Sequence, residues 1–292
     1  MKEGIMSKIV DREAVRQAIE KLPLFSPNAL QLLQLIADPD HELDDVVKIV
    51  KFDSALTMRV LKVVNSPAYG LVKEITSIDR ALTYLGERMV VSIAVQENTG
   101  QLFNKPLEGY QGGQGDLWRH DLFTAIASRE VARYAKGNFD LDLAFTGGLL
   151  HDIGKSIFAT FWKDASPDAL SQIEQGLVSD YLMAEQDLAG LDHTEVGYEM
   201  ARHWQLPESL QAVILHHHHP AEAIESMQPL VYAVHVGDIV SMMAGCDTGS
   251  DGLKYQLDPG YDEFFNLSPT TLAEILLNSQ EEFSKAEASL VI

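Results

Sequence analysis

The chain has 292 residues, which is enough for one large domain or two moderate ones. Its single cysteine, Cys246, excludes an intramolecular disulfide and favours a reducing compartment. No apolar run approaches the roughly 18 residues of a membrane span, and the start of the chain lacks the apolar core of a secretory signal. We therefore expect a soluble, cytoplasmic protein that does not bind a membrane.

The formal net charge is −21, and it is unevenly distributed. Residues 1–110 carry 13 Lys and Arg against 15 Asp and Glu, whereas residues 111–292 carry 9 against 28. Generic binding of nucleic acid is not expected, because it needs clustered Lys and Arg. The acidic surplus is typical of a solvated surface, although some of the carboxylates could also hold metal cations.

Helical periodicity dominates the first 105 residues, and no alternating strand pattern of useful length interrupts it. Asp53 is a suitable N-cap, and the sequence Asn-Ser-Pro-Ala-Tyr-Gly at 65–70 is a turn by composition. Residues 104–115 hold four glycines and a proline, which predicts a linker. The helices expected before this linker cover residues 28–37, 43–51, 54–64, 78–85 and 87–102.

A second helical part, rich in histidine, is predicted after the linker. Its expected helices cover residues 117–135 and 141–150 and then begin near residues 191, 209 and 229. From Gly245 the chain carries two Lys against nine Asp and Glu, and it becomes helical again from Thr270 to about Ser284. We expect this last stretch to be a peripheral segment that covers the core or a partner. The sequence thus predicts an all-α protein in three parts, 1–105, 106–245 and 246–292.

Histidines are concentrated in the second part, where nine of the ten lie between His120 and His235. Several of them, together with Asp152 and Asp238, fall on helix faces that also carry apolar residues. A carboxylate buried on such a face must be paired or coordinated, because burying it bare is expensive. Imidazole and carboxylate ligands together suit Fe, Mn, Zn, Co or Ni, so we expect a metal site here.

The most informative motif is the pair His151-Asp152, which follows an apolar helix directly and precedes Gly154. Lys155 lies one turn after the pair and could neutralise the charge of a substrate phosphate. His193 is in phase with the apolar stripe of its own expected helix. These positions are therefore stronger ligand candidates than an isolated histidine would be.

The run of four histidines at 216–219 cannot face a single site, because at about 100° per residue it spans about 300° of a helix. We expect His216 and His217 to point inward, and His218 and His219 to lie on the surface at the end of the helix.

Two further residues have ordinary explanations beside the functional one. Asp116 lies four residues before His120 and is either a helix cap or a ligand. His235 shares a helix face with Asp238, and we expect it in the core or behind the ligands.

The order of these residues resembles the HD superfamily of metal-dependent phosphohydrolases: His120, then His151-Asp152, then Asp238, on successive helices. The stretch from Leu22 to about Leu215 is similar to the HDOD subgroup of that superfamily. This likeness rests mainly on Asn-Ser-Pro-Ala-Tyr-Gly at 65–70 and Leu-Leu-His-Asp-Ile-Gly-Lys at 149–155. The Gly-Tyr-Pro signature of cyclic-di-GMP phosphodiesterases is absent, and Pro-Ala-Glu-Ala stands at 220–223. This departure argues against hydrolysis of cyclic di-GMP.

The resemblance implies an HD-domain-like helical bundle with an additional N-terminal helical subdomain. It also implies one or two divalent ions, with Fe, Mn or Zn expected and Asp152 as the bridging ligand. A metal-bound hydroxide would attack a phosphoester, and Asp152 and Lys155 would be the catalytic side chains. The ligands carried over from the family are His120, His151, Asp152 and Asp238 for one ion, completed by His193, His216 and His217 for the second.

The sequence leaves three functions open. The first is a metal-dependent phosphohydrolase that acts on a small phosphoester or nucleotide. The second is a non-catalytic signalling or scaffold module of a bacterial pathway, with a structural or vestigial metal site. In that case the N-terminal helices and the turn at 65–70 would dock a partner protein. The third is oxygen activation at a di-iron site, which a few members of the HD superfamily perform.

Overall fold

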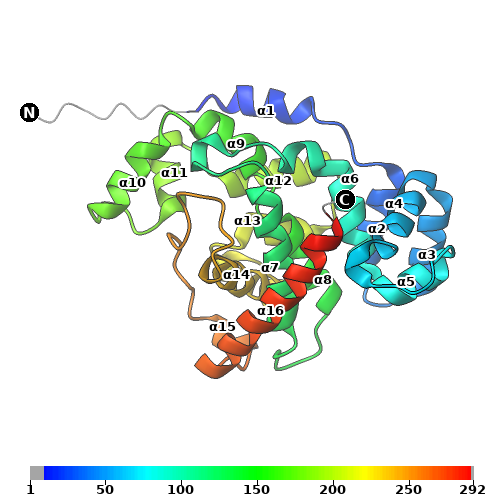
Figure 1. Cartoon of the computed structure of the whole chain (residues 1–292). Helices are drawn as coiled ribbons and strands as arrows, with labels where there is room; N and C mark the ends of the chain where they lie inside the picture. The colour runs from blue at the N-terminus through cyan, green and yellow to red at the C-terminus, as the bar shows by residue number, and fades with distance from the viewer. Residues whose placement is uncertain (1–9, 291–292) are drawn as a thin grey trace, which may run out of the picture.

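The computed structural model describes residues 10–290, and within that range it is helical and contains no β-strand (Figure 1). The prediction of an all-α protein is thereby confirmed. Helices in the first 105 residues are α1 (Arg12–Glu20), α2 (Pro27–Ile36), α3 (Leu43–Phe52), α4 (Ser54–Val64), η1 (Pro67–Tyr69), α5 (Ile78–Leu85) and α6 (Glu87–Phe103). Those that follow are η2 (Glu108–Tyr110), α7 (Asp116–Ala132), α8 (Leu141–Leu150), α9 (Lys155–Trp162), α10 (Ser166–Glu174), α11 (Tyr181–Ala189), α12 (His193–His203), α13 (Glu208–His216), η3 (Pro220–Glu222), α14 (Gln228–Met243), α15 (Tyr261–Phe264) and α16 (Pro269–Leu290). Between residues 10 and 290, none of these helices combines the length and apolar character that a membrane crossing needs.

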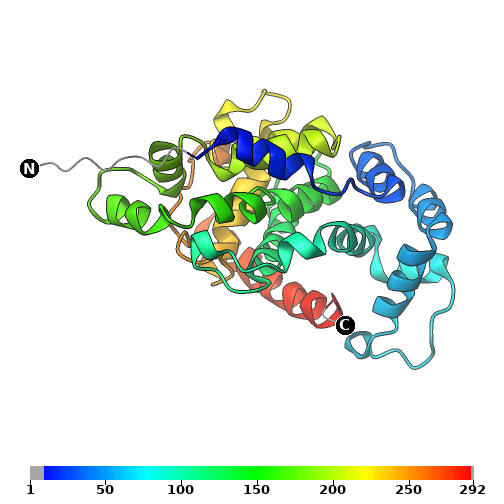
Figure 2. The ribbon, with the colours of Figure 1, turned by 90° about the horizontal axis from the view of Figure 1, so that it is seen from above.

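Helices α2 to α5 gather at one end of the molecule and are called the N-terminal lobe here (Figure 2). Helix α4 begins where the sequence predicts, because the Asp53 carboxylate accepts a hydrogen bond from the Leu56 amide. The turn after α4 is closed by Asn65, whose side-chain amide bonds both the N–H and the C=O of Ile75. Gly70 then ends η1 with a φ of 58°, a conformation that favours glycine. The predicted turn at 65–70 is therefore a defined structure, held largely by one side chain.

The first 105 residues do not all lie in this lobe. Helix α1 packs against α9 and α12 of the histidine-rich part, and α6 contacts both the lobe and α8. The predicted linker at 104–115 is also packed, since Leu107 and Tyr110 are buried and η2 lies against α9. This segment is therefore packed into the histidine-rich part and is not a free linker.

The bundle centres on α7, which packs against α8, α14 and α16. Two glycines allow α8 and α14 to come close to α7. A Cβ on Gly148 of α8 would lie 2.7 Å from the Cα of Ala125, and one on Gly237 of α14 would lie 2.2 Å from Ser128 Oγ. Because α8 and α14 come this close to α7, side chains carried by these three helices reach the same small volume.

Candidate metal centre

Six of the seven predicted ligands come together from five segments of the bundle, and only His216 lies apart from them. His120 and Asp238 lie within helices α7 and α14. The others lie at helix ends: His151 caps α8, Asp152 follows it, His193 opens α12 and His217 caps α13. A Cβ on Gly154 would lie 1.9 Å from the carbonyl oxygen of His193, so a glycine there lets α12 approach the turn that carries Asp152.

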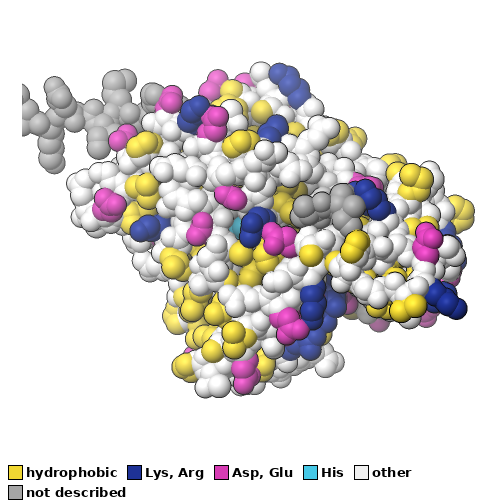
Figure 3. Space-filling view, viewed as in Figure 1, with side chains coloured by type: hydrophobic (Ala, Val, Ile, Leu, Met, Phe, Trp, Pro, Cys, Tyr) yellow, Lys and Arg dark blue, Asp and Glu magenta, His cyan; other side chains and the backbone are white. Residues whose placement is uncertain are grey.

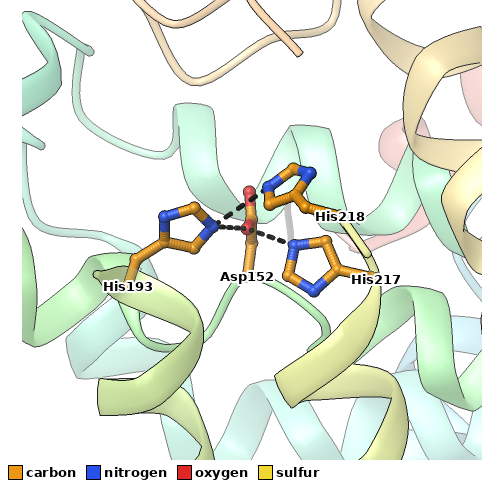
Figure 4. A group of neighbouring side chains, drawn as sticks. All are labelled: Asp152, His193, His217 and His218. Atoms are coloured by element: carbon orange, nitrogen blue, oxygen red, sulfur yellow. Dashed lines mark hydrogen bonds and ion pairs between the residues drawn. The ribbon is translucent and has the colours of Figure 1, made fainter. Parts of the chain in front are cut away.

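Asp152 lies between two sets of histidines. Figure 4 shows one of them, His193, His217 and His218, around the carboxylate. Its Oδ2 is 3.3 Å from Nε2 of His120, and its Oδ1 is 3.3 Å from Nε2 of His193 and 3.4 Å from Nε2 of His217. We call the residues around Oδ2 group A (His120, His151, Asp152, Asp238) and those around Oδ1 group B (Asp152, His193, His217, His218). One carboxylate thus belongs to both groups.

Group A is closed by Asp238 from the opposite helix. Its Oδ1 lies 3.1 Å from Nε2 of His120 and 3.7 Å from Nε2 of His151. The other ring nitrogen of each histidine is already bonded to the backbone, since Nδ1 of His120 donates to Cys246 O and Nδ1 of His151 to Gly148 O. This arrangement aims both Nε2 atoms at the centre of the group.

Group B is oriented in a similar way by a residue that sequence reasoning missed. Glu185 is fully buried on α11, and its Oε2 accepts a hydrogen bond from Nδ1 of His193 at 2.7 Å. Its other oxygen accepts a hydrogen bond of 2.6 Å from the hydroxyl of Tyr110. Nε2 of His193 then faces Nε2 of His218 at 3.2 Å. A carboxylate that holds the outer nitrogen of a histidine is the usual support of a metal ligand.

The expectation for the histidine run is wrong for His216 and for His218. His218 is buried, with 7% of its surface exposed, and belongs to group B, whereas His216 is partly exposed and contacts neither group. The helical spacing failed because α13 ends at His216 and the chain continues as a turn, which points His217 and His218 to the same side. His219 is exposed, as predicted.

Three other side chains near the cluster have distinct places. Asp116 opens α7 and accepts a hydrogen bond from the Gly113 amide, so it lies outside both groups. His235 is buried behind the ligands, as expected, where Nδ1 donates to His217 O and Nε2 accepts from the Asp258 amide. Asp121 was not anticipated. It is fully buried, and its Oδ1 lies 3.5 Å from Nδ1 of His151.

The donor atoms of both groups are better placed to coordinate metal ions than to form hydrogen bonds with one another. Nε2 of His217 and Nδ1 of His218 have no hydrogen-bond partner among the described residues, although both atoms are buried. The oxygens of Asp152 have ion-pair contacts but no well-directed hydrogen bond within the same range. Buried polar atoms without partners are rare in folded proteins, and coordination of divalent ions by imidazole and carboxylate would satisfy them.

Protonation differs between the histidines of the metal-free protein. Burial lowers the pKa of His217 to about 4 and that of His218 well below its usual value. Burial acts in the same direction on His193, but Glu185 and Asp152 outweigh it and raise its pKa to about 10. The carboxylates of Asp152 and Asp238 likewise raise the pKa of His120. Two of the histidines therefore hold protons that a metal ion would have to displace.

Lys155 lies beside the cluster and is buried. Its Nζ is 2.6 Å from Oδ2 of Asp152 and 2.6 Å from Oδ2 of Asp251. Burial disfavours its charged form, but these two carboxylates outweigh burial and raise the pKa of Lys155 above its ordinary value. Asp251 is another residue that the sequence did not reveal. It belongs to the segment expected to be peripheral, and that segment covers the bundle and reaches the centre of the site.

The chain resembles several known proteins. It is 26% identical over 229 residues to an uncharacterized protein of Treponema pallidum (strain Nichols), a match that covers 76% of this chain and 42% of that protein. The chain therefore spans less than half the length of this curated relative. More than half of the relative has no counterpart in this chain.

Solved structures share the fold. An HDOD domain protein of unknown function from Geobacter sulfurreducens has a TM-score of 0.69 at 22% identity, covering 97% of this chain and 99% of its own. A protein from Shewanella amazonensis SB2B, named "Putative metal-dependent phosphohydrolase", has a TM-score of 0.56 at 19% identity, covering 96% of each chain. At these identities the likeness shows the architecture alone. Residues 22–220 match the HDOD domain family itself, as the sequence motifs predicted, and the chain belongs to that family.

Proposed function

We propose that the protein is a metal-dependent phosphohydrolase that acts on a small phosphoester or a nucleotide at a two-metal site. The observation that carries this proposal is the position of Asp152, whose two carboxylate oxygens each face a separate set of histidines. A shared carboxylate of this kind suits two ions at a short separation, the arrangement that phosphoryl chemistry uses.

The residues of group A would hold one ion and those of group B the second, with Fe, Mn or Zn as the expected metals. Bound divalent ions lower the pKa of a water molecule and neutralise charge on phosphoryl oxygens. The protein's own part is to fix the ligands. The backbone carbonyls behind His120 and His151, and Glu185 behind His193, hold the imidazole rings in the required tautomer.

Lys155 supplies the positive charge for the substrate. Its ammonium group lies against Asp152 and is raised in pKa, so it stays charged throughout the physiological range. A charged donor held in a buried site stabilises the charge of a phosphoryl group without further reorganisation. We assign Asp152 and Lys155 the two central roles, one as the shared ligand and the other as the phosphoryl contact.

Elemental analysis of protein made without a polyhistidine tag and without added metal tests this proposal first. We expect close to two equivalents of Fe, Mn or Zn, lost in Asp152→Ala, together with hydrolysis of at least one member of a phosphoester panel. Asp187→Ala, the same substitution at an exposed position on α11, is the matched control and should keep both. Full turnover by Asp152→Ala would overturn the mechanism.

A signalling role is a second candidate, and one observation favours it. The N-terminal lobe exposes large apolar side chains, with Phe52 85%, Met58 71% and Val72 98% exposed (Figure 3). Where exposed apolar side chains adjoin one another, they form a surface suited to binding another protein. If Asp152→Ala keeps partner binding while Phe52→Ser and Met58→Ser lose it, and no phosphoester is cleaved, the signalling role is correct. We propose a cytoplasmic location for either role, which the lone cysteine favours.

A further inference from the structure

The segment between α14 and α15, residues 244–260, contacts side chains of the candidate metal centre and is called the covering loop here (Figure 1). It is fastened at both ends to residues of the site. Near its start, the carbonyl oxygen of Cys246 accepts a hydrogen bond from Nδ1 of His120. Near its end, the amide of Asp258 donates to Nε2 of His235. The loop is therefore positioned by the histidines that it covers.

The middle of the covering loop places the carboxylate of Asp251 against Lys155. Oδ2 of Asp251 lies 2.6 Å from Nζ of Lys155, and Asp251 is 1% exposed. The hydroxyls of Thr248 and Tyr255 donate to the same carboxylate at 2.9 Å and 3.0 Å. An oxyanion thus receives one charged and two neutral donors. This is the donor set that a phosphoryl group would use.

Tyr255 is the second residue of the covering loop that packs against the site. Its ring stacks on the ring of His218, with centroids 3.9 Å apart, and Nζ of Lys155 lies 5.3 Å from the ring centres of both Tyr110 and Tyr255. The residues of groups A and B are all buried, with no more than 7% of any one exposed. A phosphoester cannot reach Lys155 while the covering loop stays in this position.

We propose that the covering loop is an internal inhibitor, in which the Asp251 carboxylate occupies the place of a substrate phosphoryl group. Substrate enters by displacing Asp251 from Lys155 and moving the loop away from His218. The inference rests on the proposed function, because it assigns the phosphoryl position of the same site. The class of ligand that competes with Asp251 is a phosphate mono- or diester.

The backbone of the covering loop is suited to such a movement. Leu253 has a φ of 55°, an unfavourable conformation for a leucine, and its side chain is 59% exposed. The middle of the loop is fastened to the segment 107–112 through Ser250, whose amide donates to Tyr110 O. A Cβ on Gly249 would lie 2.2 Å from that same oxygen, so the contact is one of backbone against backbone. Separation of the loop from the segment 107–112 therefore breaks a backbone contact at this point and does not pull apart packed side chains.

The experiment measures the affinity of inorganic phosphate for the manganese-loaded protein by calorimetry. Asp251→Asn keeps the shape of the side chain and removes the competing charge, so we expect phosphate to bind about tenfold more tightly than in wild type. The control is Glu263→Gln, which removes one exposed negative charge from α15 just beyond the loop and should leave the affinity unchanged. Equal phosphate affinity in wild type and Asp251→Asn would overturn the inference.

Hydrogen exchange of residues 246–258 gives a readout that needs no turnover. We expect exchange to become faster in Asp251→Asn and also in wild type saturated with phosphate. Protection that is unchanged in both cases would contradict the displacement of the loop. Tyr255→Phe removes only the hydroxyl bonded to Asp251 and provides a second variant if Asp251→Asn does not fold. It should raise phosphate affinity by a smaller factor, and no rise would count against the inference.

The failure of this inference is distinguishable from failure of the proposed function. Tighter phosphate binding by Asp251→Asn, without hydrolysis of any ester by either protein, would support the inhibitor role and reject phosphohydrolase activity. Equal phosphate affinity together with equal rates of hydrolysis in the two proteins would support the activity and reject the inhibitor role.

Discussion

The ring of Tyr255 lies nearly parallel to the ring of His218, with centroids 3.9 Å apart and planes 14° apart. The stacking holds His218 in place beyond the end of α13, where no helix fixes its direction. Aromatic pairs of this kind contribute about 0.5–1.5 kcal/mol beyond the area that they bury. His218 is thus an ordered member of group B although it lies in a turn.

The histidine run provides a direct test of the ligand assignment. We expect His218→Ala to lose about one equivalent of metal, because it removes a ligand of group B, whereas His216→Ala should keep the wild-type content. Elemental analysis of the two variants checks this expectation. Loss of metal in His216→Ala with retention in His218→Ala would restore the assignment that the helical spacing predicted.

Glu185→Gln should weaken metal binding at group B without removing a ligand. The amide cannot accept the hydrogen bond from Nδ1 of His193 with the strength of a carboxylate, so we expect affinity to fall about 10–100-fold. Competition with a chelator measures this change. Glu199→Gln, an exposed substitution on α12, is the control. An unchanged affinity in Glu185→Gln would show that the buried carboxylate serves folding alone.

Metal binding should release protons. At pH 7, His193, with a pKa near 10, is protonated in the metal-free protein, and His120 is raised in the same direction. His217, with a pKa near 4, is already neutral and has none to give. Affinity should therefore rise with pH by about tenfold per unit for each proton displaced, up to the pKa of the histidine concerned. Calorimetry at pH 7 in buffers of different ionisation enthalpy should report one to two protons per protein. A release of zero would contradict the raised pKa values.

Gly154→Ala should destabilise the fold and disturb group B together. The added Cβ would lie 1.9 Å from the carbonyl oxygen of His193 and 2.5 Å from the Gly197 amide, and backbone atoms cannot move aside cheaply. We expect a loss of about 1–3 kcal/mol, seen as a fall of several degrees in Tm. Gly137→Ala is a matched control, because a Cβ there meets no atom within 4 Å. A Tm for Gly154→Ala equal to that of the control would exclude the tight contact between the turn and α12.

Local patterns in the sequence predict much of the fold. Helices α4, α5 and α8 begin and end where the apolar spacing and the capping residues place them, as at Asp53. The motif His151-Asp152 likewise predicts the centre of the site, because a helix and the turn that follows it are encoded by a few neighbouring residues. His218 was missed because the helical spacing was extended one residue beyond the point at which α13 ends.

The remaining site residues could not be predicted from local patterns. Asp251 lies 96 positions after Lys155, in a turn-rich segment that carries no metal-binding or phosphate-binding motif. Glu185 belongs to a different helix from His193. In a chain this rich in acidic residues, nothing in the sequence distinguishes Glu185 from the other carboxylates. Both become functional candidates only through the packing of distant segments, which the periodicity of a single sequence does not encode.

The chain that closes the cluster continues through α15 into α16, and α16 crosses the bundle to the N-terminal lobe, where it packs against α4 and η1. At that far end the hydroxyl of Tyr69 lies 3.5 Å from Ser289 Oγ. One continuous segment therefore has contacts both at the cluster and at the lobe. Any coupling that it carries between the two places is reciprocal by thermodynamic linkage. A partner that favours one placement of α16 would change ligand affinity at the cluster by the same factor by which the ligand changes the affinity of the partner.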